Sequence, residues 1–102
     1  MSAIKVNQSN FEEVKNSEKV VLLDFYADWC GPCRMVGPII EEIAGERGDI
    51  VVGKVNVDEE QELSGQFGVY SIPTLVVMKG GRVVSQSAGA KPKAQILAML
   101  EA

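Results

Sequence analysis

Histidine is absent from this sequence of 102 residues. Its absence removes imidazole, a frequent proton carrier and zinc ligand, from every proposal about catalysis or metal binding. Basic residues are also few, since ten Lys and Arg stand against fourteen Asp and Glu, for a net charge of −4. A chain without a positive field cannot neutralise phosphates, so nucleic acid is not expected as a partner.

Long apolar stretches are missing as well. The apolar runs 20–23 and 75–78 have four residues each, far short of the roughly 20 that a membrane-spanning helix needs. Residues 1–14 lack the apolar core of a secretory signal and carry two acidic residues. We therefore expect no membrane association and a location in the reducing cytoplasm.

The residues that are present are those of a globular protein. Hydrophobic residues make up 46% of the chain and charged residues 24%, which excludes disordered and fibrous classes. At this length, folding buries roughly 65% of the surface of the unfolded chain, which is enough for a core without structural disulfides or metals. We expect a single domain over residues 1–102.

Hydrophobic spacing predicts strands that alternate with helices. Segment 20–27 is almost wholly apolar, which is typical of a central strand covered on both faces. Helical spacing runs from Pro32 to Gly48, and glycines 80–81 predict a tight hairpin. We expect the order β-α-β-α-β-α-β-β-α and an α/β fold with a central mixed sheet flanked by helices on both faces. The expected strands are 4–6, 20–27, 50–57, 74–78 and 82–87.

Capping residues predict where three shorter helices begin. Ser9 and Glu12 have the spacing of a capping box, which places a helix start at Ser9. Asp58 is expected to cap a helix that ends at Gly68. Pro92 is expected in the first turn of the last helix.

Only two cysteines occur, Cys30 and Cys33, in the segment WCGPC at 29–33. A structural disulfide across so short a loop contributes only about 2 kcal/mol, against about 4.7 kcal/mol for a 100-residue loop. A structural zinc site needs about four ligands, usually Cys or His, and this chain offers two. Redox chemistry is therefore the favoured interpretation of the two cysteines, ahead of a structural disulfide or a metal site.

The position of the two cysteines supports redox chemistry. Pro32 fits the first turn of a helix, so Cys30 lies just ahead of free backbone N–H groups and the positive end of the helix dipole, which favour a thiolate. Cys33 falls within the first turn and is expected to face inward. We expect an exposed, activated Cys30 and a shielded Cys33 within its reach.

Segment 24–35, DFYADWCGPCRM, resembles the active-site segment of the thioredoxin family. Segments 54–58 and 72–74 and the region of Gly89 correspond in the same order, so the similarity covers nearly the whole chain. Tyr26 stands where the family often has Trp. The resemblance implies the thioredoxin fold, a redox-active Cys30–Cys33 disulfide and reduction of disulfides in substrate proteins.

Asp24 is the least expected residue of the apolar segment 20–27. Burial should raise the pKa of its carboxyl. One interpretation is a salt bridge with Lys54, on the strand after the crossover. The resemblance favours another, in which Asp24 deprotonates Cys33 and Lys54 modulates its charge.

The resemblance also implies a surface for substrates. Pro73 matches the cis-proline of the family, although only about 5–6% of X–Pro bonds are cis. A cis bond there would let the Ile72 backbone pair with an extended substrate segment. Trp29 and Gly89, with Gly31 and Pro32, would complete an apolar patch; Gly31 and Pro32 also tune the cysteine pair.

The sequence thus predicts a protein-disulfide reductase that acts as a monomer with no cofactor or metal of its own. A thioredoxin reductase must recycle it, with electrons from a flavin/NADPH or a ferredoxin-linked system. The alternative is a redox-silent binding module or holdase on the same fold.

Overall fold

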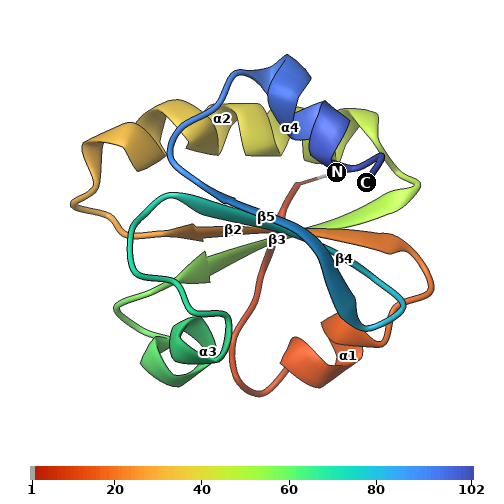
Figure 1. Cartoon of the computed structure of the whole chain (residues 1–102), viewed down its shortest axis with the longest axis horizontal. Coiled ribbons are helices and arrows are strands. Elements are labelled where there is room, and N and C mark those ends of the chain that lie inside the picture. Colours follow the sequence, from red (N-terminus) through yellow and green to blue (C-terminus); the bar gives the residue numbers. More distant parts are fainter. Residues whose placement is uncertain (1) are drawn as a thin grey trace.

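The structure, a computed structural model, describes residues 2–102. One five-stranded sheet has the order β1-β3-β2-β4-β5 (Figure 1). Strand β3 runs parallel to β1 and β2, whereas β4 is antiparallel to β2 and β5. The elements are β1 (Ile4–Lys5), α1 (Phe11–Lys15), β2 (Val20–Tyr26), α2 (Gly31–Glu46), β3 (Ile50–Asn56), α3 (Gln61–Gln66), β4 (Thr74–Lys79), β5 (Arg82–Ala88) and α4 (Lys93–Met99). The expected element order and mixed sheet are confirmed.

Strand β2 separates two apolar layers because its side chains alternate between the faces of the sheet. Leu22 belongs to the layer that includes buried residues of α2 and α4. Leu23 and Phe25 belong to the layer of α1 and α3. Figure 1 shows these two pairs of helices on opposite sides of the sheet. Asp24 lies two residues after Leu22 and therefore on the face that α2 covers.

The hairpin between β4 and β5 is also as predicted. Gly80 and Gly81 have φ values of 61° and 77°. Positive φ at both positions is what a two-residue turn needs to match the twist of its strands, and glycine supplies it without a steric cost.

The predicted helix starts were wrong at three places. Helix α1 begins at Phe11, after Asn10, because the Asn7 carboxamide accepts the Ser9 hydroxyl at 2.6 Å and occupies the predicted cap. Pro92 precedes α4 as its N-cap and lies outside the first turn. The predicted end of α2 is found: the helix stops at Glu46 with Arg47 as its C-cap, and Gly48 follows directly, although without a positive φ.

Asp58 does not cap α3. That helix begins at Gln61 with Glu60 as its N-cap. The Asn56 side-chain oxygen accepts the backbone N–H of Asp58 at 2.9 Å and forms a turn there. The Asp58 carboxylate is consequently free to bind elsewhere, and it does so in the candidate site.

Candidate active site

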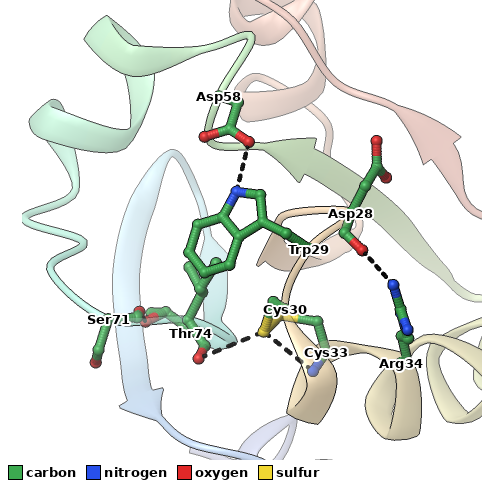
Figure 2. The surroundings of a disulfide bond; sticks show 9 residues. Asp28, Trp29, Cys30, Cys33, Arg34, Asp58, Ser71 and Thr74 are labelled. Carbon is green, nitrogen blue, oxygen red and sulfur yellow. Dashed lines mark hydrogen bonds between the residues drawn. A yellow bond between two sulfur atoms is a disulfide. The ribbon is translucent and has the colours of Figure 1, made fainter.

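Cys30 and Cys33 lie where β2 gives way to α2, and they form a disulfide with a Cα–Cα separation of 5.3 Å. Cys30 is the N-cap of α2, with extended backbone, and its sulfur accepts the backbone N–H of Cys33 at 3.2 Å (Figure 2). Pro32 occupies the start of the helix, where no N–H is needed. The predicted placement of a sulfur at the positive end of the helix dipole is therefore found.

The expected contrast between an exposed Cys30 and a shielded Cys33 is not present in the disulfide state. The two residues are 4% and 5% exposed. Both are enclosed because the disulfide draws the sulfurs together in one apolar cluster with Ala27, Tyr26 and Ile72. The cysteines differ in their neighbours instead: the Cys30 sulfur caps the helix and lies 3.8 Å from the Ile72 carbonyl oxygen.

The Ile72–Pro73 peptide bond is cis, as the resemblance implied. The Pro73 carbonyl accepts the backbone N–H of Gly89 at 2.8 Å, which joins the segment before β4 to the end of β5. Gly89 has a φ of 99°, a conformation that favours glycine. Ile72, Pro73 and Gly89, far apart in sequence, thus form one small region that also contacts the Cys30 sulfur.

Trp29 is 68% exposed beside the disulfide. Its indole N–H donates to the Asp58 carboxylate at 2.8 Å, and Figure 2 shows the ring between Asp58 and the cysteines. An exposed indole held by one hydrogen bond at its edge presents its faces to solvent. This arrangement fits the predicted docking rim, and Asp58 is a residue of the site that sequence reasoning missed.

Asp24 is only 1% exposed, and neither carboxylate oxygen has a hydrogen-bond partner among residues 2–102. Burial raises the pKa of Asp24 to about 6, and the positive charge of Lys54 opposes that rise. The interpretation of Asp24 as half of a salt bridge is wrong, because no described ammonium nitrogen lies within 4.0 Å of it.

Lys54 is nevertheless the register partner of Asp24 on the neighbouring strand. Its ammonium nitrogen lies 4.8 Å from the centroid of the Tyr26 ring. A groove of about 430 Å³ brings Lys54 together with Cys33 and Gly37 at the start of α2. Cys33 is therefore the cysteine that opens toward the Asp24–Lys54 side of the site.

Residues 2–102 contain neither a metal-binding cluster nor a membrane-spanning helix. No group of three or more Cys, His, Asp or Glu side chains is arranged to hold a metal ion. None of the described helices has the length and apolarity needed to cross a membrane.

The family model for thioredoxin matches residues 2–102. The chain belongs to the thioredoxin family. Thioredoxin 2 of Chlorobaculum tepidum is 50% identical over 99 residues, which cover 95% of this chain and 91% of that protein. The thioredoxin of Bacillus subtilis is 50% identical over 94 residues, covering 91% and 89%. Among solved structures, a mutant thioredoxin from Halobacterium salinarum is 39% identical with a TM-score of 0.91, covering 98% of this chain and 88% of that one.

These findings confirm the thioredoxin fold and the resemblance carried by the WCGPC motif. The chain is a thiol–disulfide oxidoreductase of the protein-disulfide reductase type, with a redox-active disulfide between Cys30 and Cys33. Substrates of this thioredoxin class are disulfides in other proteins.

Sequence reasoning missed two further exposed apolar side chains next to the site. Met35, two residues after Cys33, is 70% exposed, and Tyr70, two residues before Ile72, is 98% exposed. Met35 falls in the segment 32–48, whose helical spacing predicted a face packed against the sheet. The structure instead places Met35 on the solvent side of α2, while its neighbours Cys33 and Val36 are buried.

Proposed function

We propose that Cys30 and Cys33 divide the reduction of a protein disulfide into two exchange steps. In the first, the Cys30 thiolate attacks one substrate sulfur, forms a mixed disulfide and releases the other substrate sulfur as a thiolate. In the second, the Cys33 thiolate attacks the Cys30 sulfur, releases the remaining substrate thiolate and leaves Cys30–Cys33 oxidised. Two electrons pass from the dithiol to the substrate disulfide.

The observation that carries this assignment is the position of the Cys30 sulfur as the N-cap of α2. A sulfur that accepts the Cys33 N–H at the positive helix end is stabilised as a thiolate. Gly31 and Pro32 support this position, because they permit the tight entry of the chain into the helix. These two residues therefore tune the redox properties of the pair.

Asp24 serves as the proton acceptor for Cys33 in the second step, and Lys54 modulates its charge. Asp24 lies on the face of β2 that α2 covers, and Cys33 lies in the first turn of α2. With a pKa of about 6, Asp24 is mostly ionised at pH 7 and can take a proton. Protonation then relieves the cost of a buried charge without a hydrogen-bond partner.

Substrates dock on the surface formed by Trp29, Ile72, Pro73 and Gly89. The exposed indole offers apolar area beside Cys30. The Ile72 backbone, adjacent to the Cys30 sulfur, can pair with an extended substrate segment by β-augmentation. Recognition through the backbone suits a reductase that acts on many sequences.

The wider setting follows from the same proposal. The chain works as a monomer in the cytoplasm and carries no cofactor of its own, so a thioredoxin reductase must return two electrons to the Cys30–Cys33 disulfide after each cycle. A reducing compartment fits a reductase, because the dithiol must be regenerated continuously.

Two matched variants test the proposal in an insulin-reduction assay with dithiothreitol. Cys30→Ser should abolish turnover and form no adduct with substrate, whereas Cys33→Ser should accumulate mixed disulfides through Cys30. Mass spectrometry of the trapped adducts identifies the attacking cysteine. Adducts through Cys33 would reverse the assigned roles, and a wild-type chain that fails to reduce insulin would favour the alternative of a redox-silent binding module or holdase.

A further inference from the structure

Tyr26 and Lys54 make a contact that the proposed reaction does not use. The Lys54 ammonium lies 4.8 Å from the centroid of the Tyr26 ring, within the range of a cation–π interaction. Lys54 pairs in register with Asp24, and Tyr26 pairs with Asn56. Tyr26 is thus the diagonal neighbour of Lys54 on the sheet face that also carries Asp24, and Lys54 leans toward the ring.

Charge alone would not place the Lys54 ammonium next to the Tyr26 ring. Asp24 is the direct register partner of Lys54, yet neither of its oxygens has a partner and no ion pair forms within residues 2–102. The ammonium lies instead against the start of α2, where a Cβ added to Gly37 would be 3.9 Å from the Lys54 nitrogen. The Tyr26 ring and the backbone of α2 at Gly37 thus lie on two sides of the Lys54 ammonium.

Few other groups around Asp24 carry charge. Strand β4 presents Leu75 opposite it, and α2 contributes Cys33 and apolar residues to the same face. Besides the disulfide-bonded Cys33, the groove is lined by five ionisable side chains, those of Lys54, Tyr26, Asp28, Arg34 and Glu41. Of these, Lys54 alone affects the pKa of Asp24 appreciably, and it lowers that pKa. Burial is thus the main cause of the tight proton binding by Asp24, and the position of one ammonium modulates it.

We propose that Tyr26 is a positioning residue for Lys54: its ring holds the ammonium in the groove and prevents an Asp24–Lys54 ion pair that would weaken Asp24 as a proton acceptor. The proposal rests on the proposed function of Asp24 in the second exchange step. An ion-paired carboxylate binds protons less tightly, so loss of the ring should make Asp24 a poorer base for Cys33.

The experiment measures proton binding by the Asp24 carboxyl directly, through the pH dependence of its ¹³C resonance. The oxidised protein is used because its cysteines do not titrate. Tyr26→Leu should weaken proton binding at Asp24 about threefold or more, the range expected for loss of one cation–π contact. Tyr26→Phe keeps the ring and should leave the titration of Asp24 at its wild-type position. Tyr70→Leu, which removes a fully exposed ring, is the matched control and should also have no effect.

A second background separates positioning from a change in solvation. In Lys54→Met protein, Tyr26→Leu should no longer shift the titration of Asp24, because the charge that moved is gone. An equal shift in both backgrounds, or no shift with Lys54 present, would overturn the proposal. If Tyr26→Leu does not fold, the wild-type protein still decides: the Lys54 ε-methylene protons should show the upfield shift of a group above a ring, and its absence would count against the contact.

The pH profile of mixed-disulfide resolution then tests the role of Asp24 separately. With Asp24 as the base, the profile of Tyr26→Leu should move in parallel with the titration of Asp24. A titration that shifts while the resolution profile stays fixed would uphold Tyr26 as the positioning residue and refute the proposed function of Asp24. A fixed titration would refute the positioning of Lys54 whatever the profile does.

Discussion

The aspartates near the two ends of helix α2 lie in opposite environments: Asp49 is paired at the surface, and Asp24 is buried. Beyond its C-terminal end, Arg47 binds Asp49 through two N–H···O bonds of 2.8 and 2.9 Å, and this exposed pairing lowers the pKa of Asp49 to about 2. Near its N-terminal end, Asp24 is buried without a hydrogen-bond partner among residues 2–102, and its pKa rises to about 6. The pKa values of these two aspartates, Asp24 and Asp49, thus differ by about four.

The difference separates charges that are paired at the surface from a buried charge that we propose takes part in proton transfer. Lys93 at the start of α4 binds Glu42 and Glu46 on the C-terminal half of α2, which ties the two helices together at the surface. Such exposed pairs contribute little stability each. An unpaired buried carboxylate costs stability, and a fold tolerates that cost where the group has a use.

The largest effect is expected from Asp24→Asn, which removes the buried charge and keeps the shape. Because the folded pKa of about 6 exceeds the unfolded value near 3.9, the native state holds its proton more tightly, and stability falls as pH rises from about 4 through 6. The variant avoids this loss, so it should be more stable than wild type by about 3 kcal/mol at pH 7 and equal to it below pH 4. Thermal melts across this pH range measure the difference.

The same variant should resolve mixed disulfides more slowly, because Cys33 loses its proton acceptor. Asp28→Asn, which removes an exposed carboxylate from the same segment, is the control and should change neither property greatly. A destabilised Asp24→Asn protein with wild-type resolution would mean that Asp24 has a structural partner and no part in the reaction.

The contrast between the two ends of α2 also marks what the sequence can predict. Asp24 stood out because it interrupts an apolar strand, and the Cys30 N-cap followed from Pro32 at a strand-to-helix junction. Hydrophobic periodicity located the elements, and the WCGPC segment at their junction located the reactive pair. Neither could show that Lys54 leans toward Tyr26, since register and side-chain direction across two strands depend on tertiary contacts.

Capping residues were the weakest part of the sequence prediction. Ser9 and Asp58 both have favourable side chains for a helix start, yet each bonds elsewhere, to Asn7 and to Trp29. A polar side chain has several partners within reach, and local spacing cannot rank a bond across 29 residues against one across three. The Trp29–Asp58 bond was accordingly beyond sequence reasoning.

Trp29 provides a prediction of intermediate size at the reactive end of α2. It is the only tryptophan, and its indole lies beside the disulfide. Because disulfides quench indole emission on contact, fluorescence should rise when dithiothreitol reduces the pair. Asp58→Asn, which replaces the charged acceptor of the indole N–H, should change the emission of both states but keep the rise. Emission that does not respond to reduction would place the indole away from the sulfurs and weaken its role in docking.

The smallest effect is expected from Asp49→Asn, at the end of α2 where charges are paired. The folded pKa of Asp49, about 2, lies below the unfolded value near 3.9, so the pair contributes stability above pH 4 that is lost as pH falls toward 2. Asp49 is exposed and Arg47 is partly exposed, so solvent screens most of their attraction. The variant should therefore melt only slightly below wild type at pH 7, with a gap that closes in 1 M salt and toward acid, while insulin reduction stays at the wild-type rate. If Asp49→Asn altered the rate of disulfide reduction, charge at the two ends of α2 would be coupled, and the division between structural and chemical charges would fail.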